Sequence, residues 1–264
     1  MKITIFTSNQ PRHISLINKL SLICDEVYAI QECNTVVPGQ VEDFFKKSQV
    51  MKDYFSQVIA AENKFFKSKD FLHSNVRSLS IKNGDLNFLT KKELLPALDS
   101  KVYVIFGSSF IKGWLIKFLV EKKAINIHMG LSPYYRGSSC NFWALYDNKP
   151  EYVGATVHLL SEGLDSGPIL YHCLPSLENE TPFEFTMKSV LAAHESLVQR
   201  IKSNEINTRE VIKQNKNEEV RYTINKDFTD QVASEFLNRN LNNQILKETI
   251  SNREYPKLID PFFL

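Results

Sequence analysis

Short apolar runs alternate with amphipathic stretches along the first half of the chain. Residues 2–7 form a β-branched run that ends in a polar turn, and residues 26–30 form a second run. Between them, Pro11 fits the first turn of a helix whose apolar positions recur at helical spacing. Residues 101–106 and 124–128 read as further buried strands with a helix between them. This strand–helix–strand order predicts an α/β fold with a Rossmann-like, mostly parallel sheet and flanking helices.

A long helical stretch is expected over residues 41–69. Its aromatic side chains are typical of core packing and include Phe44, Phe45, Tyr54, Phe55, Phe65 and Phe66. Residues 70–90 show no clear pattern, and residues 94–98 resemble a short helix.

The second half of the chain predicts two more strands and a long helix. Residues 153–160 alternate as a strand does, and residues 169–173 are expected to form the last strand. Thr181 and Pro182 then open a long helix as its N-cap and first helical residue.

The chain becomes more polar and less regular near residue 205. We therefore expect a main domain over residues 1–204 and a short helical and irregular extension over 205–264, with a helix at 228–238. The aromatic end of the chain, residues 262–264, indicates apolar surface to be covered, so the extension is expected to serve formation of a homodimer.

Composition narrows the class of protein further. The 264 residues include 32 basic and 30 acidic side chains, a net charge of +2, with 43% hydrophobic residues. This balance is typical of a globular chain and argues against a disordered chain or a nucleic-acid partner. The four cysteines form no CxxC pair, which predicts free thiols and no metal site. With neither a leader-like N-terminus nor a long apolar run, we expect a cytoplasmic protein without a membrane partner.

Candidate chemistry begins at the end of the strand over residues 124–128. Asn126 and His128 point to one side of that strand, because side chains alternate with period two. An amide and an imidazole at the carboxyl end of a parallel strand suit a reaction that builds negative charge on a carbonyl oxygen. About forty residues later, Asp165 lies on a glycine-flanked loop, from which a carboxylate can orient the imidazole and relay protons through water.

The order and spacing of these residues carry a family resemblance. INIHMGLSPYYRG followed by VGATVHLLSEGLDSGPIL resembles the core of the 10-formyltetrahydrofolate-dependent formyltransferases. That family's pattern is Asn-x-His-x-Ser-Leu-Leu-Pro-x-Tyr/Trp-x-Gly, then Gly-hydrophobic-Thr and Leu-Asp-x-Gly-x-hydrophobic. The resemblance makes Asn126, His128 and Asp165 the catalytic trio, and Thr156 and Gly167 also fall on the pattern.

The sequence departs from the pattern at two positions. Gly130 stands where the family commonly has Ser, and Ser132 stands where it often has Leu. Both positions lie outside the trio, so we expect them to affect the shape of the loop and the choice of acceptor.

The resemblance implies a formyl donor and a place for it. The donor would be 10-formyltetrahydrofolate, bound beside the trio in an apolar slot walled by the strand-to-helix turn. The residues expected to bind it are Phe106, Gly107, Ser108, Ile111 and Gly167.

The acceptor is expected to bind at the first strand–turn–helix. Ser8, Asn9 and Arg12 lie there at a helix N-terminus, a position that suits a phosphate or diphosphate. Tyr134, Tyr135 and Arg136 in the loop after the catalytic histidine are further candidates for acceptor binding. We expect the acceptor to be the primary amine of a nucleotide-linked amino sugar, as in surface polysaccharide synthesis.

Three alternatives stay open at the level of sequence. The resemblance also covers methionyl-tRNA formyltransferases, but these need a basic tRNA surface and a C-terminal barrel, for which some sixty residues after Asn204 are too few. A formyltetrahydrofolate hydrolase would release formate without an acceptor. A catalytically inactive binding module is the third alternative, and the complete trio argues against it.

Overall fold

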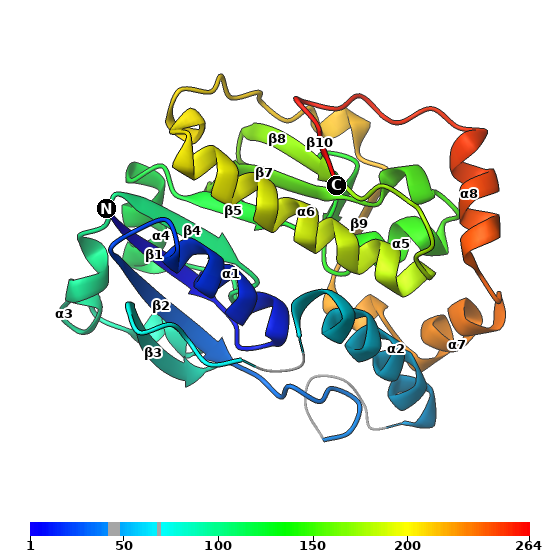
Figure 1. The fold of residues 1–264 in the computed structure, drawn as a ribbon, viewed down its shortest axis with the longest axis horizontal. Coiled ribbons are helices and arrows are strands. Elements are labelled where there is room, and N and C mark those ends of the chain that lie inside the picture. The colour runs from blue at the N-terminus through cyan, green and yellow to red at the C-terminus, as the bar shows by residue number, and fades with distance from the viewer. Residues whose placement is uncertain (42–47, 68–69) are drawn as a thin grey trace.

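The computed structural model describes residues 1–41, 48–67 and 70–264 of the chain. In these ranges the main sheet has eight strands in the order β10-β8-β7-β5-β4-β1-β2-β3. Strands β1 to β5 pair in parallel, and β7 is antiparallel to both β5 and β8. The mostly parallel α/β sheet with flanking helices is therefore confirmed (Figure 1).

The strands of the main sheet have these bounds: β1 Lys2–Thr7, β2 Glu26–Cys33, β3 Val76–Lys82, β4 Val102–Phe106, β5 Ile125–His128, β7 Ala155–Leu159, β8 Ile169–Leu174 and β10 Phe262–Phe263. The α-helices are α1 Pro11–Ser21, α2 Gln49–Phe66, α3 Lys91–Leu94, α4 Gly113–Glu121, α5 Cys140–Tyr146, α6 Pro182–Lys202, α7 Asp230–Asn238 and α8 Asn243–Ser251.

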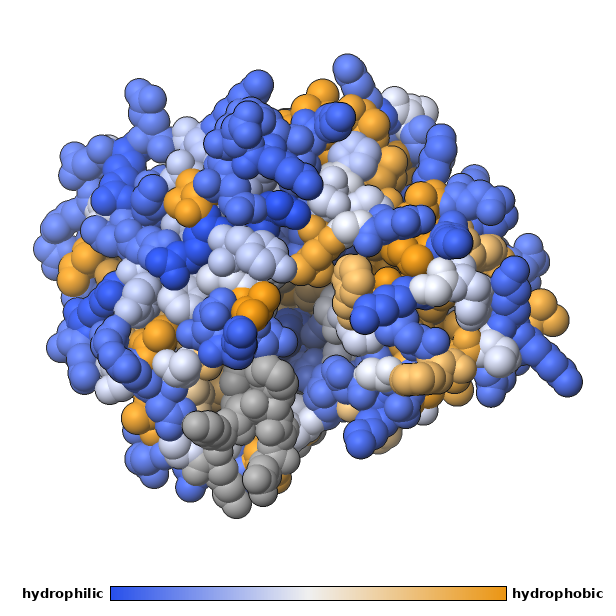
Figure 2. Space-filling view, turned by 180° about the vertical axis from the view of Figure 1, so that it is seen from behind, coloured by the Kyte–Doolittle hydropathy of each residue, from blue (hydrophilic) through white to orange (hydrophobic). Residues whose placement is uncertain are grey.

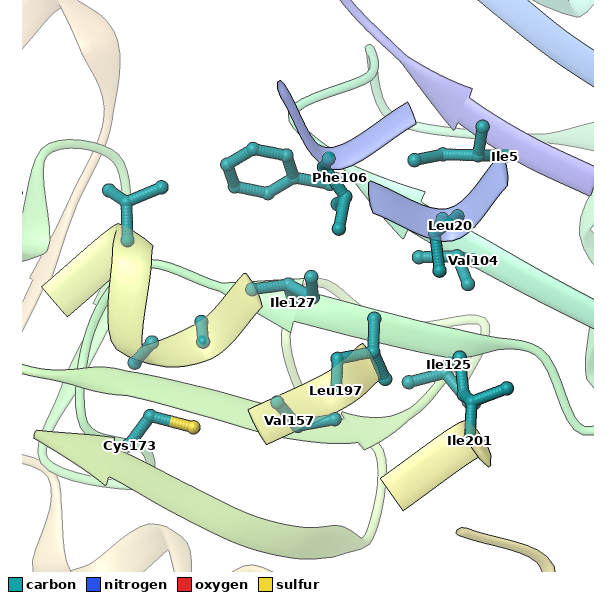
Figure 3. Packing of buried hydrophobic residues seen from close by; sticks show 14 of the residues in the cluster. Ile5, Leu20, Val104, Phe106, Ile125, Ile127, Val157, Cys173, Leu197 and Ile201 are labelled. Atoms are coloured by element: carbon teal, nitrogen blue, oxygen red, sulfur yellow. The ribbon is translucent and has the colours of Figure 1, made fainter. Parts of the chain in front are cut away.

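Alternation along the strands divides the core between the two faces of the sheet. Ile5, Val104 and Ile127 pack with α1 and α6 on one face, where Leu20 and Leu197 meet them (Figure 3). On the opposite face, a second cluster packs under α4 and includes Phe6, Tyr28, Ile105, Leu115 and Leu119. Strands buried on both faces explain why the sequence shows continuous apolar runs here.

The expected helix over residues 41–69 is present as α2, Gln49–Phe66, with Ser48 as its N-cap. Phe44 and Phe45 lie outside the described residues. Of the expected short helix over residues 94–98, Leu94 ends α3 and Leu95–Leu98 form a 3₁₀ turn. The region 70–90, which had no clear pattern, contains strand β3, whose mostly exposed side chains gave no apolar run.

Residues 169–173 form a strand as predicted, within β8. The prediction that this strand is the last one is wrong. Strand β9, Arg221–Thr223, pairs in parallel with β6, Tyr135–Gly137, and β10 pairs in parallel with β8. Strands of two or three residues are too short to show a period, so pattern alone does not find them.

These late strands join residues 205–264 to the rest of the molecule. Ile212 exchanges both backbone hydrogen bonds with Ile169 at the start of β8. The predicted helix at 228–238 is confirmed as α7, and its Phe236 belongs to the same buried cluster as residues of α2 and α5. The extension therefore folds onto the main domain along most of its length (Figure 1). None of the helices described here is long and apolar enough to cross a membrane.

Candidate active site

The candidate site lies where β5 ends at the carboxyl edge of the parallel strands. Ile125 and Ile127 point into the core, while Asn126 and His128 point to the other side, as period two predicts. The loop after β7 brings Asp165 to the same place. The Asn126 Nδ2 atom lies 3.3 Å from Asp165 Oδ1, and His128 Nδ1 lies 3.3 Å from Asp165 Oδ2. The structure therefore brings the three predicted catalytic side chains together.

Both ring nitrogens of His128 face acceptors. Nδ1 faces the Asp165 carboxylate, and Nε2 lies 3.1 Å from the carbonyl oxygen of Tyr135. The His128 side chain is only 6% exposed, so these contacts fix its orientation.

A second histidine, His158 on β7, completes the cluster and was missed from sequence. Its Nδ1 lies 2.8 Å from the carbonyl oxygen of Leu159, which makes Nδ1 the protonated nitrogen. Burial lowers the pKa of His158, so the ring is neutral and Nε2 accepts the Asn126 amide at 2.9 Å. His158 therefore sets the orientation of the Asn126 side chain. The signal in the sequence was its place in the alternating strand. The structure pairs it directly with Asn126 on β5.

The loop that carries Asp165 is held from two sides. Asp165 adopts a positive φ of 44°. Gln214 Nε2, from the C-terminal extension, donates to the carbonyl oxygens of Asp165 at 2.9 Å and Gly167 at 2.7 Å. A Cβ at Gly167 would lie 1.7 Å from the Leu159 carbonyl oxygen, so only glycine fits against β7 there. Gly167, predicted to bind the donor, thus has a structural role in this arrangement.

The loop after β5 is shaped by Thr156, another residue on the family pattern. Its hydroxyl donates to the Gly130 carbonyl oxygen and accepts from the Ser132 amide, both at 2.7 Å. Gly130, one of the two departures, lies against His128 and Cys140. A Cβ there would lie 2.5 Å from Cys140 Cβ and 2.8 Å from His128 Nε2. Cys140 thus fills the space into which a larger residue at position 130 would project.

A cleft of about 760 Å³ opens in front of the trio. It is lined by Asn126, His128, Asp165 and His158, and also by four of the predicted donor-binding residues: Phe106, Gly107, Ser108 and Ile111. Figure 2 shows that the face of the molecule seen from behind is hollowed near its middle. A volume of this size is typical of a small-molecule site.

The predicted acceptor residues at the start of α1 reach the cleft only in part. Ser8 and Arg12 line it, but Asn9 exchanges two hydrogen bonds with the backbone of Asn34 instead. Arg12 also makes a 2.6 Å ion pair with Glu62, whose carboxylate accepts from the Arg12 backbone amide. A protein carboxylate therefore already takes one anion position at this helix N-terminus, and Arg12 keeps further N–H groups for a ligand.

The loop residues predicted to bind the acceptor lie elsewhere. Tyr134 and Tyr135 are buried, and their hydroxyls bond to the Lys257 carbonyl oxygen and to Asp147. Arg136 bridges Glu219 and the Leu164 carbonyl oxygen. None of the three is among the described residues that line the cleft. The reason is that this loop continues into β6, which pairs with β9 and turns both tyrosines inward.

No group of three or more metal-ligating side chains that could hold an ion is found where the structure describes the chain. The four cysteines are free thiols.

An amide, an imidazole and a carboxylate gathered at one strand end of a mostly parallel sheet form an arrangement that can stabilise negative charge on a carbonyl oxygen. A formyl transferase family model matches residues 99–201 of the chain.

Curated relatives match part of the chain. A methionyl-tRNA formyltransferase from Thermosynechococcus vestitus is 38% identical over 78 residues, which are 30% of this chain and 23% of that protein. A mitochondrial formyltetrahydrofolate deformylase from Arabidopsis thaliana is 34% identical over 100 residues, 38% of this chain and 29% of that protein. The match thus spans about a quarter of the length of these relatives.

The fold as a whole is similar to solved formyltransferase structures. An N-formyltransferase from Helicobacter canadensis, in complex with folinic acid and dTDP-3-aminofucose, has a TM-score of 0.53 and 17% identity, covering 87% of this chain and 72% of that chain. This similarity shows the formyltransferase fold.

Proposed function

We propose that the protein transfers the formyl group of 10-formyltetrahydrofolate to the primary amine of a nucleotide-linked amino sugar. The observation that carries the proposal is the meeting of Asn126, His128 and Asp165 at the wall of a cleft that also reaches the start of α1. In this proposal the folate lies beside the β4–α4 turn and the acceptor lies toward Arg12, and residues of both places line the cleft.

The trio supports direct transfer between the two ligands. The neutral amine attacks the formyl carbon, a C–N bond forms, and the carbonyl oxygen becomes an oxyanion. His128 donates to that oxygen, and Asn126 turns one amide hydrogen toward it from the longer 3.3 Å contact with Asp165 while keeping the 2.9 Å contact with His158. The amine proton passes through water to Asp165, and Asp165 returns a proton through water to the leaving folate nitrogen as the bond between that nitrogen and the formyl carbon breaks.

The net charge of the chain and the packing of residues 205–264 support a sugar acceptor. The formal charge of +2 over 264 residues provides no strong basic field for a polyanion. Residues 205–264 pair with β6 and β8 and pack under α5, so they complete the main domain. Their role in a homodimer stays a prediction.

A methionyl-tRNA acceptor is the second candidate. It is favoured by the 38% identity to a methionyl-tRNA formyltransferase over 78 residues. A tRNA acceptor would need a strip of cations beside the cleft, whereas Arg12 is the only arginine or lysine among the described residues that line it.

An acceptor screen tests the assignment. The protein is incubated with 10-formyltetrahydrofolate and, in separate reactions, nucleotide-linked 3-amino and 4-amino sugars or charged initiator tRNA, and release of tetrahydrofolate is followed. We expect turnover with at least one amino sugar. Turnover with tRNA alone would replace the sugar by the second candidate, and formate release without any acceptor would make the protein a hydrolase.

A further inference from the structure

A second cavity lies on the other side of His128 from the trio's carboxylate. This cavity, the aromatic pocket, has a volume of about 290 Å³ and is lined mainly by residues of α2, α5, α6 and α7 together with the end of β5. The aromatic side chains that line it are Tyr54, Phe55, Phe142, Phe183, Phe228 and Phe236.

The aromatic pocket and the cleft meet at the catalytic histidine. Both cavities are lined by His128, and they also share Arg12, Met129 and Gly137. The ring stands between them, because Nδ1 faces Asp165 in the cleft while Nε2 lies 3.5 Å from Cys140 Sγ in the wall of the pocket. A ligand group in the pocket would therefore lie next to the group that reacts at His128.

Polar side chains of α5 and α6 in the pocket wall already have partners. Asn141 donates to Ser189 and accepts from the Gly154 amide, and the Thr186 hydroxyl donates to the Phe183 carbonyl oxygen. No carboxylate lines the pocket among the residues described, and burial raises the pKa of the Cys140 thiol, which stays protonated. A wall of this kind favours a ligand group without charge and with few hydrogen-bonding atoms.

The volume sets the size of that group. An apolar cavity of about 150 Å³ binds benzene. The aromatic pocket is roughly twice as large, so it fits a bicyclic ring or a branched alkyl group.

We propose that the aromatic pocket receives an alkyl or aryl substituent that the acceptor carries next to its reacting amine. This inference rests on the proposed function and specifies its acceptor: an amino sugar in which apolar groups replace hydroxyls on the side that faces α6. The charged part of the same acceptor lies in the cleft near Arg12, at the junction of the two cavities.

Binding of indole tests the pocket without any turnover. A fluorinated indole is titrated into the protein and followed by fluorine NMR, with wild type compared with Thr186→Phe, which fills the pocket from α6. The matched control is Thr249→Phe, because Thr249 is also a half-buried helical threonine whose hydroxyl bonds to a backbone carbonyl, outside both cavities. We expect wild type and the control to bind indole and Thr186→Phe to bind it at least tenfold more weakly. Val190→Phe fills the same space one turn further along and serves if Thr186→Phe does not fold.

Paired acceptors then test the substrate class. Two nucleotide-linked amino sugars that differ only in an alkyl group or a hydroxyl near the amine should differ by about 10- to 200-fold in kcat/KM, in favour of the alkyl compound. Thr186→Phe should abolish this preference, and indole should compete with the acceptor and not with the folate.

The outcomes separate this inference from the proposed function. Indole that fails to bind wild type, or that binds Thr186→Phe and Val190→Phe equally well, overturns the pocket even if a sugar is formylated. A second outcome is that indole binds wild type and the control but not the pocket variants, and competes with an aminoacyl-tRNA acceptor when no sugar reacts. That outcome overturns the sugar as acceptor and supports an apolar group on a different acceptor.

Discussion

The cleft and the aromatic pocket meet at His128, but polar side chains line much of the cleft whereas aromatic side chains line much of the pocket. The cleft is formed by strand ends and loops and holds Asn126, Asp165 and Ser8. The aromatic pocket is formed by the inner faces of four helices and holds phenylalanines whose neighbours are other phenylalanines. The comparison teaches that one histidine side chain can line a polar cleft on one side and a mostly apolar pocket on the other.

The largest expected effect is a loss of turnover from a change in the cleft that leaves the aromatic pocket intact. Asn126→Ala removes one donor to the oxyanion, which typically costs about 3–4 kcal/mol in the transition state. We expect turnover to fall by about two to three orders of magnitude in the folate assay, with indole binding in the pocket unchanged. Asn238→Ala, an exposed change on α7 outside both cavities, is the control. Near-normal turnover in a folded Asn126→Ala protein would contradict the catalytic assignment.

A change at the junction should affect the acceptor more than the donor. Arg12→Ala removes a guanidinium that lines both cavities, and a hydrogen bond to a charged group contributes about 1.5–3 kcal/mol. We expect KM for the acceptor to rise by about one to two orders of magnitude and KM for the folate to stay within a factor of two or so. Arg239→Ala, which removes an arginine bonded only to the surface at Tyr146, is the matched control. A rise in KM for the folate alone would indicate that the folate, and not the acceptor, binds near Arg12.

The helix that walls the aromatic pocket also makes the protein sensitive to acid. His194, one turn beyond Val190 on α6, is fully buried with neither ring nitrogen bonded. Burial lowers the pKa of His194 to about 3, from an ordinary value of 6.5. Between these values the unfolded chain binds a proton and the folded protein does not, so stability falls as the pH drops below about 6.5.

This acid sensitivity can be measured by urea unfolding at two pH values. At pH 5 the neutral His194 should lower the free energy of unfolding by about 2 kcal/mol relative to its value at pH 7.5. His194→Phe keeps a ring against Phe66 and Phe106 and should remove that share of the difference. An unchanged difference between the two pH values in a folded His194→Phe protein would show that the ring does not stay neutral.

The sequence was informative where the chemistry depends on period and order. Asn126 and His128 point to one side of β5 as predicted, because side chains alternate along a strand, and the loop after the antiparallel strand β7 brings Asp165 to them. The sheet was predictable for the same reason. His158 was not, because a buried histidine in an alternating strand reads as packing until its partner is known.

Other features depended on contacts distant in the chain. The pairing of β9 with β6 buries Tyr134 and Tyr135, and nothing local in that loop predicts a partner some eighty residues away. The aromatic pocket was hidden for a related reason. An aromatic stripe on α2 predicts core packing, and only the arrangement of four helices leaves space between the rings.

The smallest expected effect concerns a segment that contributes to both cavities. Residues 205–264 supply Thr223 to the cleft and Phe236 to the aromatic pocket, and their Gln214 holds the backbone of the Asp165 loop. Gln214→Ala removes two neutral hydrogen bonds, each with a net contribution of about 1 kcal/mol, and lets the carboxylate move away from His128. We expect kcat to fall by about tenfold or less with both KM values nearly unchanged, and indole binding to remain intact. Gln231→Ala, which removes a surface contact on α7, is the control. If kcat is unaffected while KM for the acceptor rises, Gln214 contributes to acceptor binding. The proposal that residues 205–264 position the Asp165 loop would then be wrong.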